Sequence, residues 1–269
     1  MAIRPLARFA AEALVVLLAL LGLSLWIRFA DLDMALQRMF FTQGRGWPIG
    51  KLPPLRLFYH LGPVLPAALA VLALFGLCMG FRGGFWRLRR RSALFLLLHF
   101  LLGPGLLVNA LLKEGMGRPR PRHVLEFGGP KRFVPVLEAG AEGRGASFPS
   151  GHASIGAFLL APFFLQRRRS RKTAFSFLAG GLIYGGALGL TRMLQGGHFL
   201  SDVLWALGLV YLTGLLLARA LGLDRPAWDS DQVRIDPKIA NPADPKSTGP
   251  IHAAATGLSI LFPPRFRSV

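Results

Sequence analysis

The sequence predicts an all-α integral membrane protein built as a six-helix bundle. Hydrophobic residues make up 52% of the 269 residues, and mean hydropathy is +0.45. Charged residues make up only 17% of the chain, against about 25% in a soluble domain, and they cluster between long apolar runs. The apolar content excludes disorder over most of the chain. The single cysteine, Cys78, lies inside an apolar run, which excludes a disulfide scaffold.

Six apolar segments approach the ~20 residues that a spanning helix needs. They cover residues 10–29, 62–81, 92–112, 152–165, 173–190 and 200–221. The fourth segment is the shortest; a buried soluble helix is an alternative interpretation, but its apolar neighbours favour a short or tilted span. The first segment is longer than the apolar core of a cleavable signal peptide, and no small-residue cleavage pattern follows it before Arg28. We therefore expect it to be retained as an anchor.

The basic connections predict the orientation in the membrane. Arg4 and Arg8 lie near the N-terminus, and the loops 82–91 and 166–172 each carry five basic residues and no acidic one. Short loops rich in Lys and Arg stay in the cytoplasm, so both chain termini are expected inside. Three connections are then expected outside: 30–61, 113–151 and 191–199.

The net charge of +19 and the pI near 11.7 would indicate a nucleic-acid partner in a soluble protein. Here the arginine runs are interpreted as topology signals that also meet anionic lipid headgroups, and no nucleic-acid partner is expected. Residues 1–223 form the predicted six-span domain. Residues 224–269 are rich in Pro and Asp and are expected to form a largely irregular cytoplasmic tail.

The predicted outside connections carry an unusual set of polar residues at the ends of the spans. The third span ends in KEGMGRPRPRH, the fourth begins at SFPSGHAS, and TRMLQGGHFLSD joins the fifth and sixth. These stretches place the following candidates on one side of the membrane: Lys113, Arg118, Arg120, Arg122, His123, Ser150, Gly151, His152, Arg192, His198 and Asp202. Their common location indicates one site rather than scattered surface charges.

These residue types suit chemistry on a phosphate group. Lysine and the guanidinium forks of Arg120 and Arg192 bind tetrahedral oxyanions, and backbone N–H groups at a helix start favour an anion. His198 and Asp202 are four residues apart and share a helix face. A carboxylate on one imidazole nitrogen makes the other a better nucleophile, and His152, on another span, is free to act as acid and base.

Each residue also has a structural interpretation. Arg and Lys at span ends commonly extend to headgroups, Ser150 can serve as a helix cap, and Arg192 and Asp202 can pair. A metal site is a further alternative, but zinc or a hard cation does not gather Arg and Lys around it. We therefore expect no metal at this site.

Three motifs together resemble the signature of the type 2 phosphatidic acid phosphatase superfamily. They are Lys113-x6-Arg120-Pro121, Pro149-Ser150-Gly151-His152 and Arg192-x5-His198-x3-Asp202, in the family's order and spacing. Thr191 stands where the family usually has serine, which is a conservative departure. The resemblance covers roughly residues 60–220.

The resemblance implies a six-helix membrane bundle with the active site at the periplasmic ends of the helices, and metal-independent hydrolysis without a cofactor. It implies that His198 attacks phosphorus and forms a phospho-histidine, that Asp202 orients it, and that His152 protonates the leaving oxygen and then activates water. The phosphoryl oxygens would be held by Lys113, Arg120, Ser150, Gly151 and Arg192.

The stretch GPGLLVNALLKEGMGRPRPRHVLEFGG is similar to the branch of the family that dephosphorylates lipid A in the periplasm. The expected partner is accordingly a phosphorylated membrane lipid, with lipid A phosphate as first choice, and the expected location is the bacterial inner membrane. Possible headgroup contacts are Arg118, Arg122 and His123, together with Lys131, Arg132 and Arg144. His60, His99 and His252 match no motif, and His99 is expected to make a polar contact within the bundle.

Other functions remain open at this point. Undecaprenyl diphosphate and phosphatidylglycerophosphate are alternative substrates, and a lipid phosphotransferase is possible because any bound hydroxyl can resolve a phospho-histidine. Vanadate-dependent haloperoxidases share the signature, but they are soluble, whereas six apolar segments favour a lipid substrate. A non-catalytic lipid binder would not need the complete set of nucleophile, acid and cations.

Overall fold

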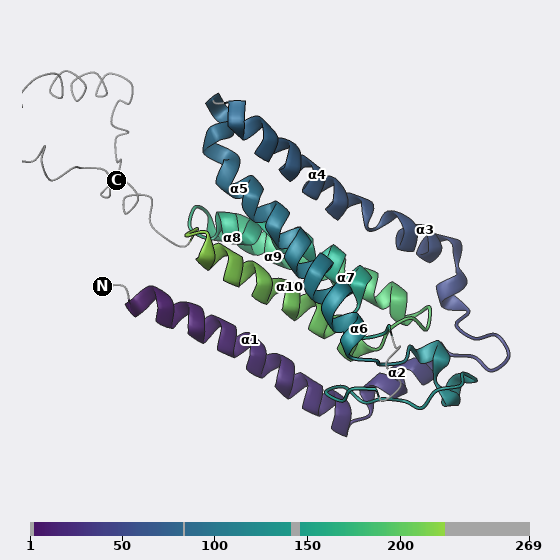
Figure 1. Cartoon of the computed structure of the whole chain (residues 1–269). Coiled ribbons are helices and arrows are strands. Elements are labelled where there is room, and N and C mark those ends of the chain that lie inside the picture. Colours follow the sequence, from purple (N-terminus) through teal and green to yellow (C-terminus); the bar gives the residue numbers. More distant parts are fainter. Residues whose placement is uncertain (1–2, 83, 141–145, 224–269) are drawn as a thin grey trace, which may run out of the picture. The chain divides into compact units, whose positions relative to one another are not determined.

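The computed structural model describes residues 3–82, 84–140 and 146–223. The predicted tail 224–269 lies outside the described residues, and so do Arg144 and His252. Within the described ranges the chain is helical, with two isolated bridges, Thr42–Gly46 and Val124–Lys131, and no longer β-structure. The predicted all-α class is therefore confirmed (Figure 1).

The elements follow one another along the chain as α-helices joined by short 3-10 or π-helical stretches. They are α1 (Ile3–Phe29), α2 (Leu32–Phe40), η1 (Ile49–Lys51), α3 (Pro53–Leu61), α4 (Val64–Met79), η2 (Gly80–Arg82), α5 (Gly84–Phe100), η3 (Leu101–Leu112), α6 (Lys113–Gly115), η4 (Pro121–His123), η5 (Leu125–Phe127), α7 (Gly151–Ala157), η6 (Phe158–Leu160), α8 (Pro162–Gln166), α9 (Arg171–Met193) and α10 (Leu200–Ala220).

Five helices of the described part are long and apolar enough to cross a membrane. They are Leu6–Phe29, Pro53–Met79, Arg89–Leu112, Arg171–Met193 and Leu200–Ala220. Their outward faces carry large apolar side chains, such as Val15, Leu72 and Ile183, that are more than 60% exposed. A soluble monomer rarely exposes such continuous apolar surface, and hydrocarbon accommodates it. The protein is therefore an integral membrane protein.

Two spans differ from the sequence prediction. The second begins at Pro53 rather than near residue 62, because Pro53 and Pro54 start a helix at its first positions and α3 leads directly into α4. The fourth segment is a 16-residue apolar stretch, Gly151–Gln166. It is divided into α7, a 3-10 turn and α8, where Pro162 occupies the first turn of α8.

The bundle packs around α10, which contacts α1, α5, α7 and α9. Phe95, Phe158, Phe164 and Val210 are buried together in its core. His99 of α5 lies 2.8 Å, through Nε2, from the carbonyl oxygen of Val210 in α10, so the polar contact predicted for His99 is present.

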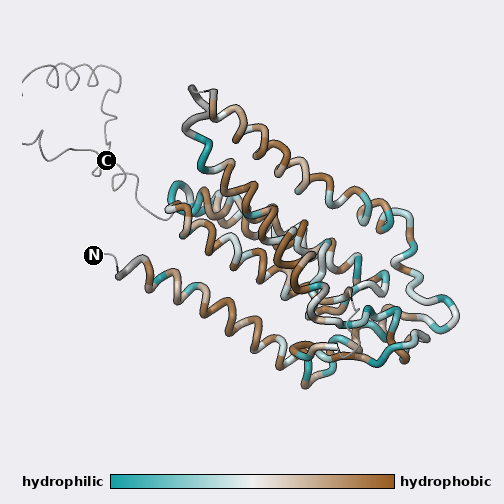
Figure 2. Tube along the Cα trace, in the orientation of Figure 1, coloured by the Kyte–Doolittle hydropathy of each residue, from teal (hydrophilic) through white to brown (hydrophobic). Residues whose placement is uncertain are grey.

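One end of the bundle is polar. Figure 2 shows apolar colour along most of the long helices and hydrophilic colour in the segments around α2, α3 and α6. Of these segments, α2 contacts α10 and α3 contacts α9, and this end holds the candidate site.

Candidate active site

A pocket of about 500 Å³ opens at the polar end of the bundle. It collects residues from four separate parts of the chain: the η1–α3 segment, the stretch from α6 to η4, the start of α7 and the α9–α10 junction. The lining residues are Gly50, Lys51, Arg56, Tyr59, His60, Lys113, Arg120, Arg122, His152, Arg192, Gln195 and His198. The structure thus brings together five residues that the motifs predicted to share a site: Lys113, Arg120, His152, Arg192 and His198.

His198 is held in one orientation at the floor of this pocket. The Nδ1 atom lies 2.6 Å from the carbonyl oxygen of Ser147. A carbonyl only accepts, so Nδ1 carries the proton and Nε2 keeps the lone pair of the neutral ring. Burial lowers the pKa of His198 below its ordinary value, although the neighbouring Asp202 carboxylate opposes this. His198 is therefore neutral near pH 7, which is the state that a nucleophile requires.

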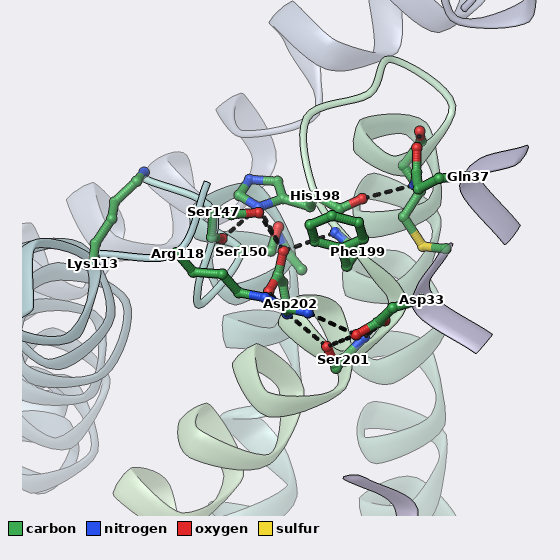
Figure 3. Close-up of polar contacts among 12 residues, drawn as sticks. Asp33, Gln37, Lys113, Arg118, Ser147, Ser150, His198, Phe199, Ser201 and Asp202 are labelled. Carbon is green, nitrogen blue, oxygen red and sulfur yellow. Dashed lines mark hydrogen bonds and ion pairs between the residues drawn. The ribbon is translucent and has the colours of Figure 1, made fainter. Parts of the chain in front are cut away.

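Asp202 supports His198 by a less direct route than the sequence suggests. Its Oδ2 atom is 3.6 Å from Nδ1 of His198, beyond a normal hydrogen bond. The same oxygen accepts from the Ser147 hydroxyl at 2.5 Å and from the Phe199 backbone N–H at 2.8 Å. Asp202 therefore binds both Ser147, whose carbonyl accepts from His198, and Phe199, which follows His198 in the chain (Figure 3).

Arg118 has a structural role, and its predicted headgroup contact is wrong. Its side chain is 1% exposed. Nε donates to the Val134 carbonyl at 2.9 Å, Nη1 to Asp202 at 2.5 Å, and Nη2 to Asp33 at 2.8 Å. The guanidinium also lies over the ring of Phe199, 4.5 Å from its centroid. Every nitrogen of Arg118 is thus engaged inside the protein, and none can reach a lipid.

The contacts of Arg118 also fix its charge. Burial acts to lower the pKa of Arg118, but the carboxylates of Asp202 and Asp33 outweigh it and raise the pKa. Asp33 closes the network, because its oxygens accept from the Ser201 backbone N–H at 2.9 Å and from the Ser201 hydroxyl at 2.6 Å. The start of α10 is therefore bound through hydrogen bonds and ion pairs to two other segments, α2 and the loop after the third span.

A second contact from α2 reaches His198 itself. The Gln37 side-chain amide donates to the carbonyl oxygen of His198 at 3.0 Å. The Gln37 carbonyl oxygen in turn accepts from the indole N–H of Trp47 at 2.9 Å, and both side chains are buried. No local spacing in the sequence connects α2 to residues about 160 positions later, so sequence reasoning missed Asp33 and Gln37.

Ser150 and Gly151 are both buried and are not among the pocket-lining residues. The Ser150 hydroxyl accepts from the Ala153 backbone N–H at 3.4 Å, so it caps α7. A Cβ on Gly151 would lie 2.4 Å from Oδ1 of Asn109, and the same oxygen accepts from Lys113 at 3.3 Å. Glycine at 151 therefore lets α7 approach the helix that carries Lys113.

Arg120 and Arg192 present unpaired polar atoms. The Nε atom of each is buried and has no hydrogen-bond partner among the described residues. Arg192 donates from Nη1 to the Gln195 side-chain oxygen. A Cβ on Gly197 would lie 2.6 Å from Nη2 of Arg192, so the absence of a side chain at 197 leaves room for the guanidinium. Buried, incompletely paired guanidinium groups are suited to an oxyanion ligand.

Tyr59 of α3 lies between two predicted site residues. Its ring stacks on His152 with centroids 4.5 Å apart and planes 18° apart. Cζ of Arg192 lies 4.6 Å from the centroid of the same ring. Tyr59 therefore orients both side chains, and the two prolines at 53 and 54 are the signal that would have placed it on a helix leading to the site.

The remaining residues that were predicted to contact the lipid headgroup differ in whether they line the pocket. Arg122 lines the pocket, whereas His123 is exposed, like Arg132, and neither is among the lining residues.

Burial lowers the pKa of Lys113, and the charges of Arg120 and Arg192 lower it further. The pocket thus combines a neutral imidazole with crowded cations, which is an arrangement for attack on an anionic electrophile.

Comparison with known proteins finds related sequences. A model described as the PAP2 superfamily matches residues 92–226. The lipid A 4'-phosphatase of Francisella tularensis subsp. novicida is 40% identical over 125 residues, covering 46% of this chain and 55% of the relative. The lipid A 1-phosphatase of Rhizobium etli is 37% identical over 145 residues, covering 51% and 57%.

Among solved structures, a transmembrane PAP2-type phosphatidylglycerolphosphate phosphatase from Bacillus subtilis has a similar fold. The TM-score is 0.52 and the identity 21%, over 80% of this chain and 98% of the other. The chain spans about half the length of the curated relatives it matches.

Proposed function

Because the chain belongs to the PAP2 superfamily, we propose that it is a metal-independent lipid phosphatase that works through a phospho-histidine. The observation that carries this proposal is His198, fixed by the Ser147 carbonyl, at a pocket that also holds Lys113, Arg120 and Arg192. Near pH 7 a phosphomonoester carries close to two negative charges, and these three cations offset them while leaving phosphorus open to attack.

In the proposed mechanism Nε2 of His198 attacks phosphorus in line, so an N–P bond forms as the P–O bond to the lipid breaks. His152 gives its proton to the departing lipid oxygen. It then takes a proton from water, which attacks the phospho-histidine, releases phosphate and restores His198. Asp202 and Ser147 position His198, while Ser150 and Gly151 support the phosphate site by setting the start of α7.

We propose lipid A phosphate as the first substrate. The support is the 37–40% identity to proteins named lipid A 4'-phosphatase and lipid A 1-phosphatase, together with the family match over residues 92–226, which contains all three motifs. Phosphatidylglycerophosphate and undecaprenyl diphosphate are the next candidates, and transfer of the phosphoryl group to another lipid is the alternative reaction. For location we propose the bacterial inner membrane, with both termini cytoplasmic and the pocket facing the periplasm.

The test uses the purified chain in nonionic detergent with excess EDTA. We expect release of inorganic phosphate from lipid A, and a lipid product lighter by one phosphate in the mass spectrum. Phosphatidylglycerophosphate is assayed in parallel. A well-folded protein that releases phosphate from neither lipid, nor from undecaprenyl diphosphate, contradicts the proposed function; a phosphorylated acceptor lipid in the spectrum indicates the transferase instead.

Tyr59 offers a matched pair of variants. Tyr59→Leu removes the stacking on His152 and the cation–π contact with Arg192, and we expect kcat/KM to fall about 10- to 100-fold, because such contacts contribute roughly 1–3 kcal/mol together. Tyr59→Phe keeps the ring and should stay near wild type. Equal rates for the two variants would show that the ring has no positioning role.

The charge state of Lys113 is expected to determine how kcat/KM changes on the alkaline side of the pH profile. Its lowered pKa means that the ammonium loses its proton at a lower pH than an exposed lysine does. The loss removes a positive charge from the phosphate site, so kcat/KM, which reports the free enzyme, should decline on the alkaline side. Lys113→Arg stays protonated and should show a flatter profile between pH 7 and 10. An identical decline in both proteins would assign it to another group.

A further inference from the structure

The pocket holds more positive charge than one phosphate group requires. Six of its lining residues are lysines or arginines, namely Lys51, Arg56, Lys113, Arg120, Arg122 and Arg192. No described residue that lines the pocket is acidic, and none of the six forms an ion pair within the described ranges. Exposed arginines outside the pocket at the same end differ, since Arg28 pairs with Glu138 at 2.6 Å and Arg38 with Glu126 at 2.5 Å.

Three of these six, Lys51, Arg56 and Arg122, are not motif residues, and they come from three elements that line the pocket, η1, α3 and η4. Arg56, Tyr59 and His60 lie at i, i+3 and i+4 of α3 and so share one face of that helix. The stacking of Tyr59 on His152 directs this face to the site. Arg56 is therefore placed along the pocket wall by the same helix that orients the proposed acid.

Lys51 and Arg122 are exposed, but each is tied to the pocket wall by a hydrogen bond, Lys51 through its side chain and Arg122 through its backbone. Nζ of Lys51 donates to the Arg45 carbonyl at 2.8 Å, which leaves two of its three N–H groups available. The backbone N–H of Arg122 donates to the Gly196 carbonyl at 3.1 Å, which ties η4 to the turn before His198. Burial lowers the pKa of Arg120, and the charge of Arg122 lowers it further, so the two guanidinium groups repel each other.

We propose that Lys51, Arg56 and Arg122 form a second anion subsite, which binds another anionic group on the headgroup of the lipid whose phosphate lies at His198. This inference rests on the proposed function and narrows it to lipids with at least two anionic groups in the headgroup. A pocket of about 500 Å³ falls within the ~300–1,000 Å³ that encloses a ligand of drug size, so it has room for more than one phosphate. A second anion would also relieve the repulsion between the cations.

The test compares two lipids in nonionic micelles that contain no other anionic lipid. Phosphatidic acid carries one phosphate, and phosphatidylglycerophosphate carries two. We expect Arg56→Gln/Arg122→Gln to reduce the ratio of kcat/KM for the two-phosphate lipid over the one-phosphate lipid by roughly tenfold or more, since a charge-assisted hydrogen bond is lost at each position. Arg168→Gln/Arg169→Gln, which changes two exposed arginines outside the pocket, should leave the ratio at its wild-type value.

A binding measurement separates this inference from the proposed function. In a His198→Ala background, dissociation constants for both lipids are measured with and without the Arg56→Gln/Arg122→Gln change. Tighter binding of the two-phosphate lipid that depends on these arginines supports the subsite, even if the wild-type protein releases no phosphate. Equal losses for both lipids, or no loss for either, overturn the subsite, even if the protein proves to be a phosphatase.

Discussion

His198→Ala is expected to lower kcat by about four orders of magnitude, because it removes the group that forms the covalent intermediate. The side chain is buried, with Nδ1 donating to the Ser147 carbonyl, and the two other histidines that line the pocket, His60 and His152, are held differently. His152 is stacked on Tyr59 and His60 belongs to α3. The variant should remain folded, with a melting temperature near that of the wild type in detergent.

The intermediate can be observed directly with radiolabelled p-nitrophenyl phosphate. Its leaving group needs no proton, so His152→Ala should still be phosphorylated on His198, while hydrolysis is slowed by the loss of the base. We expect acid-labile, base-stable label on His152→Ala and none on His198→Ala. Label on His198→Ala, or turnover by it close to the wild-type rate, would contradict the proposed nucleophile.

Arg118→Met is expected to destabilise the protein by about 3–5 kcal/mol, because it leaves two buried carboxylates without their cation. Asp33 and Asp202 are 4% and 0% exposed and both bind this guanidinium. Thermal unfolding in detergent should therefore occur at a clearly lower temperature. Adding Asp33→Asn removes one of the two carboxylates and should restore part of the loss, which a double-mutant cycle measures as coupling.

Arg38→Met is the matched control for this substitution. Arg38 also binds two carboxylates, Asp31 at 2.8 Å and Glu126 at 2.5 Å, but its side chain is 50% exposed. Solvent screens such pairs, so the loss should be below about 1 kcal/mol. Equal unfolding temperatures for Arg118→Met and Arg38→Met would contradict the expectation that the buried ion pairs of Arg118 contribute more to stability than the exposed pairs of Arg38.

The sequence predicts the helical class and the reacting groups because both depend on local patterns. Apolar runs of spanning length mark the membrane helices, and the motif residues lie within short stretches at their ends. Lys113, Arg120, His152, Arg192 and His198 accordingly meet in one pocket. The predicted start of the second span is wrong because the polar residues Arg56 and His60 interrupt the apolar pattern, although the prolines at 53 and 54 begin a helix there.

What the sequence did not predict are the contacts between distant segments. The same RPRPR stretch supplies Arg120 to the pocket, Arg118 to the interior and Arg122 to the rim. Which arginine turns inward depends on buried carboxylates, and one of these, Asp33, lies 85 residues earlier. Spacing alone cannot distinguish three arginines two residues apart, whereas burial and hydrogen bonding assign each a different environment.

Because α2 and α3 contact the motif residues, the segment needed to build the site is longer than the segment by which the family is identified. The family match begins at residue 92, so it contains every motif but excludes Asp33, Gln37 and Tyr59. A chain cut at that boundary would keep the reacting groups and lose the side chains that hold them. A chimera with a relative should accordingly exchange residues 30–61 together with the motifs, because the two stretches share one hydrogen-bond network.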